Sequence, residues 1–440
     1  MPRKSVRIKT LISIFLIILL FTGCSRLFGY SFEYEGKKPD KEELEGGKEP
    51  ETLVLEQPIG GDRVGDEPDN KPNAVEEPPP SPQPLGTTSL KISAVGDIMV
   101  HAHQLKAAKQ SDGSYDFTEV FKDIKPYLEE ADIAIGNLET TISTDKIGYT
   151  AYPRFRSPES LISALKWAGF DVLTTANNHC LDGTEFGITN TLDKLDEYEI
   201  YHTGTARSQE ERDKALILDV NDIKVAVLAC TYGTNGMESA VNQDKLKYMV
   251  SYLKDIPKIG EDIQRAKGEG AEFIIVCAHW GEEYVRNPNE WQKDMADKLF
   301  DLGVDVIFGS HPHVIQPAEY KKISNPDQGE KDVFVIYSLG NIVSNQSRQY
   351  GKYMHYSDSG LIMNLEVIKD YDNDTLSIGD IDYIPTWVYK FTKDDKLHYR
   401  ILPVRDFMDG KLDSAANERI KEVWKETTTH MDSDDLKARE

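Results

Sequence analysis

Residues 304–313 read VDVIFGSHPH. A run of valine, isoleucine and phenylalanine ends in a glycine and a serine, and two histidines follow one residue apart. Such a short apolar run is typical of a buried strand. His311 and His313 would then lie just beyond its carboxyl end, in a turn that either holds a metal ion or is only a polar loop. The choice depends on whether other ligand-type residues occupy equivalent places along the chain.

The same pattern recurs along the chain. Six short apolar segments end in polar residues, and they cover residues 90–95, 132–135, 171–176, 272–278, 304–308 and 333–338. Helical spacing of apolar residues is found between them, over residues 117–131, 157–169, 184–198 and 289–303. Pro126 predicts a break in the first of these helices. Strands that alternate with helices predict an α/β fold, a layered sheet with helices on its faces.

Potential metal ligands follow five of the expected strands. They are Asp97, Glu139, Asn177, Asn178, His179, His279, His311 and His313. In an open α/β sheet the loops at the carboxyl ends of the strands converge on one edge. Any one of these motifs is explained as well by a turn, a cap or a hydrogen-bonded core histidine. Their joint occurrence favours one site built from carboxylates, an amide and imidazoles.

The N-terminus predicts export and a lipid anchor. Four basic residues precede an apolar run that begins at Leu11 and ends in FTGC at residues 21–24. A basic start and about a dozen apolar residues are typical of a secretory signal and short for a membrane span. FTGC resembles the bacterial lipoprotein processing site, which would make Cys24 the lipidated mature N-terminus at the extracellular face of the cell membrane. The alternative is an uncleaved N-terminal anchor.

The next segment differs sharply in composition. Residues 30–88 contain ten of the chain's 21 prolines, and 15 acidic against 6 basic residues. Such a segment cannot bury enough apolar surface to offset its ordering entropy, so a disordered tether is expected. The predicted organisation is a signal peptide over residues 1–23, a tether over 24–88, a folded domain over 89–405 and a charged tail over 406–440.

Charge and cysteine content limit the function further. The formal net charge is −24, and removal of the four basic residues of the signal makes it more negative. A nucleic-acid partner is therefore not expected, because it would require a basic face. Once Cys24 is assigned to lipid, three cysteines remain, and an odd number gives no obvious disulfide framework.

A family resemblance adds to these inferences. RFRSPESLISALKWAGFDVLTTANNHCLDGTEFGITNTLDKL, residues 154–195, resembles the bacterial capsule-synthesis protein CapA family, also known as poly-γ-glutamate synthesis proteins. The similarity runs from about Lys91 to about Val404. That family is similar in fold to calcineurin-like metallophosphoesterases. The resemblance therefore implies a two-layer β-sandwich flanked by helices, with a dinuclear metal site at one edge.

The resemblance also implies roles for individual residues. Two divalent ions (Mn, Fe or Zn) would be held by Asp97, Glu139, Asn178, His279, His311 and His313. His179 would donate to the leaving group or substrate. Arg156 would grip an anionic group, or else form only a surface salt bridge. Met99 stands where the resembled enzymes have a histidine, and His101 and His103 are the neighbours that could replace it.

Three other features have less specific interpretations. Trp280, Glu283 and Tyr284 either line a substrate cleft or form a packed aromatic corner. Asn341 is interpreted as a turn former, with a ligand role as the alternative. The acidic stretch DYDNDT, residues 370–375, lacks the frame of a calcium loop and is interpreted as a hairpin turn.

Two functions from different classes follow. The first is a role in capsule or poly-γ-glutamate synthesis, in which the site binds an anionic polymer beside a membrane-embedded synthetase. The second is a secreted metal-dependent hydrolase that acts on a phosphoester substrate of the cell envelope. The fold alone does not choose between them.

Overall fold

The computed structural model describes residues 86–440, apart from 326–328, 434–435 and 440. The expected signal peptide, Cys24 and almost all of the expected tether lie outside the described residues. Among the residues that are described, none of the helices combines the length and the apolar character that crossing a membrane requires.

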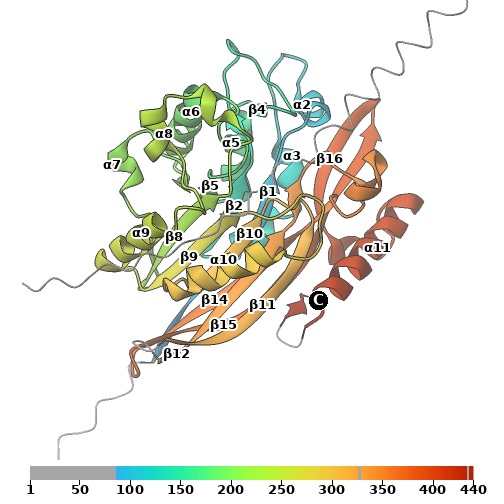
Figure 1. Ribbon diagram of the computed structural model, residues 1–440. Coiled ribbons are helices and arrows are strands. Elements are labelled where there is room, and N and C mark those ends of the chain that lie inside the picture. Colours follow the sequence, from blue (N-terminus) through green and yellow to red (C-terminus); the bar gives the residue numbers. More distant parts are fainter. Residues whose placement is uncertain (1–85, 326–328, 434–435, 440) are drawn as a thin grey trace, which may run out of the picture. The chain divides into compact units, whose positions relative to one another are not determined.

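Two β-sheets pack face to face (Figure 1). Within the described part of the chain the first sheet has nine strands, and seven of them follow the order β16 (Lys396–Pro403), β15 (Thr375–Lys393), β14 (Ser359–Asp370), β1 (Thr87–Ile98), β2 (Ile133–Leu138), β5 (Val172–Thr174) and β6 (Tyr201–Thr203). The other two are β13 (Asn341–Val343), which pairs with β1, and β17 (Lys437–Ala438), which pairs with β15. The second sheet has the order β11 (Ile315–Asn325), β12 (Gly329–Leu339), β10 (Val306–Ser310), β9 (Phe273–His279), β8 (Ile223–Thr231) and β7 (Ile217–Val220). A two-stranded sheet joins β3 (Thr141–Ile142) to β4 (Arg156–Ser157).

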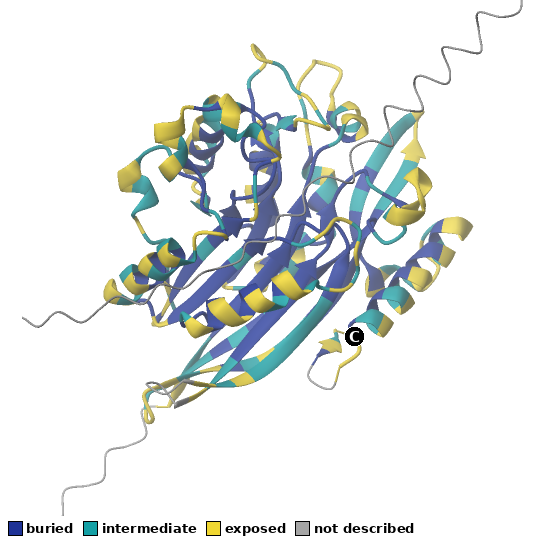
Figure 2. Cartoon of the chain, in the orientation of Figure 1, coloured by how far each residue is buried: buried dark blue, intermediate teal, exposed yellow. Residues whose placement is uncertain are grey.

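Strand periodicity explains how both faces of each sheet are buried. Neighbouring residues of a strand point to opposite faces. In β9, Phe273 and Ile275 lie in the core between the sheets, whereas Ile274 and Val276 lie in the core beneath the helices. The strands are therefore continuous apolar runs, as the sequence indicated. Figure 2 shows the strands as mostly buried and the outer faces of the helices as exposed.

Helices cover the outer faces of both sheets. The outer face of the second sheet packs against α9 (Ile256–Gly268) and α10 (Glu290–Asp301). The core on the outer face of the first sheet includes residues of α2 (Ala102–Ala108), α3 (Thr118–Phe121), α4 (Lys125–Glu129), α5 (Ser160–Ala168), α6 (Thr184–Glu197) and α8 (Gln243–Met249). The short helix α7 (Gln209–Arg212) lies near the edges of both sheets. The prediction of an α/β fold with a two-layer sandwich flanked by helices is confirmed.

Two local predictions are also confirmed. The helix expected over residues 117–131 is broken, and Pro126 lies in the first turn of α4, where its missing N–H costs no helical hydrogen bond. The acidic stretch over residues 370–375 joins β14 to β15, where Asp370 pairs with Thr375 across the hairpin.

The residues expected as a charged tail contain a docked helix. The apolar face of α11 (Ser414–His430) packs on β15 and β16 through Ile420 and Val423. Arg419 forms an ion pair of 2.7 Å with Asp358, and both side chains are buried. Burial lowers the pKa of Arg419, but the hydrogen bond to Asp358 raises it, and the net effect is a raised pKa. This pair fastens α11 to the start of β14.

Candidate metal centre

The carboxyl ends of parallel strands bring the predicted ligands together. In the first sheet β1, β2 and β5 run parallel, and in the second sheet β8, β9 and β10 do the same. Asp97 is the penultimate residue of β1, Glu139 follows β2, and His279 ends β9. The two sheets meet at this edge, where Asp97 Oδ2 lies 3.0 Å from His313 Nδ1. Strand topology therefore gathers residues that are up to 216 positions apart in the chain.

Two groups of ligand-type side chains share Glu139. Asp97, Glu139 and His313 each offer a ligand atom within 4.8 Å of the others, and so do Glu139, His279 and His311. Glu139 Oε1 lies 3.8 Å from His279 Nε2 and 3.9 Å from His313 Nε2. All five side chains are buried. Glu139 is therefore the carboxylate that the two groups of potential metal ligands have in common.

Asn178 belongs to the His279 side of the site. Its Oδ1 lies 3.0 Å from His279 Nε2, the same nitrogen that faces Glu139. Asn178 follows β5, so a third strand of the first sheet contributes to the site. All six residues expected as metal ligands thus lie together, although their role in binding metal stays a prediction.

The hydrogen bonding of these residues fits a metal ion. Glu139 is 0% exposed, yet neither carboxylate oxygen has a hydrogen-bond partner within the described residues. His311 Nδ1 also lacks one. Burial and the charge of Asp97 raise the pKa of Glu139 well above its usual value. Leaving a buried carboxylate unpaired is costly, and a cation at this position would remove that cost.

Two of the three histidines, His279 and His311, are held in the neutral form that binds metal, whereas at His313 burial is outweighed by the hydrogen bond to Asp97, which raises its pKa. Burial and the neighbouring imidazole of His313 lower the pKa of His311 to about 3. Burial, followed by the charges of His311 and His313, lowers the pKa of His279. Neutral imidazoles keep a lone pair for a metal, and together with carboxylate and amide oxygens they suit manganese, iron or zinc. The donor set therefore fits the ions that the resemblance implied.

The backbone at the site is strained in a way that positions the histidines. His311 has φ = 96° and His313 has φ = 57°, a region that residues other than glycine seldom adopt. Tyr284 has φ = 65°, and its N–H donates to Pro312 O at 2.8 Å. At Gly96 a Cβ would lie 1.9 Å from Gly340 O, so only glycine fits beside Asp97. Three strained residues in one site are typical of a functional centre.

The histidine missing at position 99 is not replaced from nearby. The side chain of Met99 is buried in the core. His101 Nδ1 accepts from Asn345 N at 3.3 Å, and its ring packs edge-on against Phe155 at 5.0 Å. His103 is exposed on α2. Neither belongs to the groups of metal ligands found among the described residues. The Asp97 side of the site therefore has one potential ligand fewer than the resembled enzymes have.

His179 forms a buried pair with an acid. Its Nδ1 lies 2.8 Å from Asp182 Oδ2, and Asp182 also accepts from Phe155 N at 2.5 Å. Arg156 Nη2 donates to Asp182 O at 3.2 Å, and Arg156 forms no ion pair within the described chain. The surface salt bridge considered for Arg156 is therefore not found. Asp182 fixes the ring of His179, as acids commonly do for histidines that transfer protons.

The sequence did not identify the residues that orient the ligands. Asn137 Nδ2 donates to Asp97 Oδ1 at 2.8 Å and lies 3.3 Å from His279 Nδ1. Asn341, interpreted above as a turn former, is buried in β13 with its Oδ1 3.1 Å from His313 Nδ1. Ser310 Oγ lies 3.0 Å from His279 Nδ1. The only signal for these residues was their place at the ends of apolar runs, which many turn residues share.

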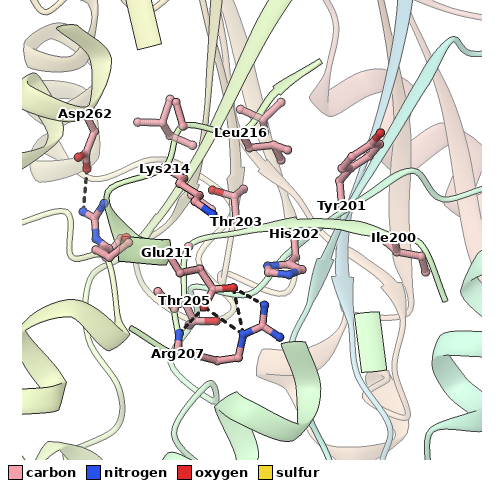
Figure 3. Close-up of a pocket in the computed structure, with 18 of the residues that line it drawn as sticks. Ile200, Tyr201, His202, Thr203, Thr205, Arg207, Glu211, Lys214, Leu216 and Asp262 are labelled. Carbon is pink, nitrogen blue, oxygen red and sulfur yellow. Dashed lines mark hydrogen bonds and ion pairs between the residues drawn. The ribbon is translucent and has the colours of Figure 1, made fainter. Parts of the chain in front are cut away.

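A cavity of the described chain lies elsewhere. It has a volume of about 770 Å³ and is lined by β6, α7 and β8 (Figure 3). Its charged groups bind one another: Arg207 pairs with Glu211 at 2.5 Å, and Arg212 pairs with Asp262 at 2.7 Å. The candidate ligands are absent from its lining. Cavity volume and side-chain chemistry therefore indicate different functional sites. Buried polar atoms without hydrogen-bond partners favour the metal centre as the functional site.

Comparison with solved structures gives low similarity scores. A calcineurin-like phosphoesterase, YfkN from Bacillus subtilis, is 16% identical, with a TM-score of 0.39 over 78% of this chain and 97% of that chain. A phosphatase from Mycoplasma pneumoniae is 14% identical, with a TM-score of 0.38 over 68% of this chain and 93% of that chain.

Sequence comparison is more specific. Capsule biosynthesis protein CapA of Bacillus anthracis is 32% identical over 270 residues, which are 58% of this chain and 60% of the relative. PGA biosynthesis protein CapA of Bacillus subtilis (strain 168) is 28% identical over 260 residues, which are 58% of this chain and 64% of the relative. The match thus spans less than two thirds of the length of these relatives. Residues 91–346 match the family model described as bacterial capsule synthesis protein PGA_cap. The chain belongs to this family.

Proposed function

We propose that the chain takes part in the synthesis of a capsule or poly-γ-glutamate polymer, and that its metal centre acts on an anionic group. The role in polymer synthesis is supported by family membership and by the names of its Bacillus relatives. The metal centre is supported above all by Glu139, a buried carboxylate that has no hydrogen-bond partner among the described residues and that is shared by two groups of ligand-type side chains.

The proposed centre holds two divalent ions. Asp97, Glu139 and His313 would hold one ion, and Glu139, Asn178, His279 and His311 would hold the other. When bound, such ions polarise a phosphoryl or carboxyl oxygen and lower the pKa of a bound water. Two carboxylates neutralise only half of the charge of two divalent ions, so the site would attract an anion although the protein is acidic.

The chain's own residues would perform the remaining tasks. His179, held by Asp182 through Nδ1, is oriented to donate a proton to a leaving group from its other ring nitrogen. Arg156, bound to the Asp182 carbonyl, would contact an anionic substrate group beside His179. Asn137 and Asn341 hold Asp97 and His313 in place and so preserve the geometry of the site.

A metal-dependent phosphoester hydrolase that acts outside polymer synthesis is the second candidate. The His179–Asp182 pair supports it, because an oriented proton donor serves phosphoester hydrolysis and does not require a polymer substrate.

One experiment separates the two. The full chain is purified and assayed against phosphomonoesters and phosphodiesters with manganese, zinc or iron, and surface polymer is measured in cells that produce either wild type or Glu139→Gln. Loss of polymer in the variant supports the first proposal. Unchanged polymer combined with metal-dependent hydrolysis in vitro supports the second, and the absence of both effects contradicts each of them.

We also propose that a lipid on Cys24 holds the chain at the outer face of the cell membrane, with residues 24–88 as a spacer. Support comes from FTGC after the apolar run and from the proline-rich acidic composition that follows. Cys24→Ala should leave an unprocessed precursor. Radiolabelled fatty acid on the variant at the wild-type level would contradict this proposal.

A further inference from the structure

The loop between β9 and α10 brings a third carboxylate to the metal centre. Glu283 is exposed, and it offers a ligand atom that lies within 4.8 Å of ligand atoms of both His311 and His313. Its neighbour Glu282 belongs to no such group among the described residues, and Glu282 Oε1 accepts from Asn289 Nδ2 at 3.4 Å. Exposure alone therefore does not explain the position of Glu283.

The backbone on both sides of Glu283 is fixed. Before it, Trp280 N donates to Ser310 O at 3.0 Å, and Trp280 Nε1 donates to Tyr337 O at 2.9 Å. After it, Tyr284 donates to the carbonyl of Pro312, between the two histidines, with its own backbone in the left-handed region.

The charge and ligand count of the centre explain why a carboxylate would be useful here. Met99 leaves the Asp97 side with only Asp97, Glu139 and His313, whereas the other side has Asn178 in addition to Glu139 and two histidines. His313, the histidine on the poorer side, is one of the two that Glu283 approaches. A third carboxylate would also neutralise part of the positive charge that Asp97 and Glu139 leave.

We propose that Glu283 is a metal ligand on the solvent-facing side of the centre and supplies from the loop after β9 the coordination that Met99 does not provide. The inference rests on the proposed metal centre. An exposed carboxylate on a fixed backbone can bind the ion without closing the site, because solvent and substrate keep access beside it. The ion on the Asp97 side is then the one that depends on Glu283.

The test measures metal affinity and requires no substrate. Manganese binding to the metal-free full chain is followed by titration calorimetry for wild type, Glu283→Gln, Glu282→Gln and Glu139→Gln. Glu283→Gln should weaken one of two binding events by about tenfold to a hundredfold, and the other event should change little. Glu282→Gln, the matched control on the same loop, should bind as wild type does.

The outcomes distinguish this inference from the metal centre itself. Wild-type affinity in Glu283→Gln, combined with lost binding in Glu139→Gln, would overturn the role of Glu283 and leave the centre intact. No binding of manganese, zinc or iron by wild type would overturn both. Equal weakening in Glu282→Gln and Glu283→Gln would indicate a general loss of surface charge and would also overturn the role of Glu283.

Discussion

The metal centre and the cavity at the edges of the two sheets satisfy their polar groups in opposite ways. In the cavity, Arg207 pairs with Glu211 (Figure 3), and it also forms ion pairs with Asp193 and Asp196, so the charge of Arg207 is compensated within the described chain. In the metal centre, the oxygens of Glu139 and one nitrogen of His311 have no hydrogen-bond partner among the described residues. The cavity offers volume, but it is at the metal centre that binding of a cation would remove the free-energy cost of buried polar groups without hydrogen bonds. A missing partner therefore identifies a site better than an empty volume does.

The largest expected effect comes from removing the shared carboxylate. Glu139→Gln should abolish the rise in melting temperature that manganese gives wild type, a stabilisation of about 2.7 kcal/mol at a hundred times the dissociation constant. The metal-free variant should melt at or above the metal-free wild type, because an ionised Glu139 is penalised by burial and by Asp97. Calorimetry with and without manganese measures both.

Glu211→Gln in the cavity is the control for this experiment, since Glu211 carries a charge outside the metal centre. It should keep the full response to manganese. If Glu139→Gln responded as strongly as this control, the contrast between the two regions would be wrong.

The next effect concerns catalysis. Where the assay detects hydrolysis, His179→Ala should lower kcat by about 10²- to 10⁴-fold, the usual contribution of general acid catalysis, and leave metal content unchanged. Asp182→Asn should lower kcat less, because an amide keeps a hydrogen bond to the ring. Loss of metal in His179→Ala would instead make His179 a ligand, and an unchanged kcat would exclude it as the proton donor.

A smaller effect is expected in the cavity. Arg207→Met removes three ion pairs and should destabilise the fold by about 1–2 kcal/mol without changing metal affinity. The midpoint of urea denaturation at constant manganese concentration measures this. Arg348→Met is the control, since its pair with Glu422 is more exposed and should contribute less than about 0.5 kcal/mol. A loss of metal affinity in Arg207→Met would mean that the two regions are coupled.

The sequence predicted those features of the site that depend on local pattern. The apolar run before Gly309 forms β10, and the run before His279 forms β9, because strand propensity and length are local properties. Parallel strands place their carboxyl ends at one edge of the sheet, so the sequence also predicted that His279 and His311 lie near each other. The docking of α11 through Arg419 was not predictable, because its partner Asp358 lies 61 positions away.

The details of coordination depend on packing across the sheets and were beyond sequence reasoning. Met99 could have been compensated by His101 or by His103, but His101 contacts Asn345 and Phe155, His103 is exposed, and neither belongs to the ligand groups of the described residues. The approach of Glu283 to the histidines likewise depends on the fixed loop after β9. The sequence indicated Glu283 only as a possible lining residue of a cleft and did not place it among the ligands.

His311 and His313 are expected to bind metal in one shared centre. The most direct measurement is the metal content of the purified full chain after equilibrium dialysis, for wild type, His311→Ala, His313→Ala and the double variant, with His103→Ala as the control. A shared centre predicts two equivalents in wild type and in His103→Ala, fewer in each single variant and fewest in the double variant, because His313 and His311 belong to the two ligand groups that share Glu139. Wild-type metal content in both single variants would contradict it and would leave GSHPH as a polar turn.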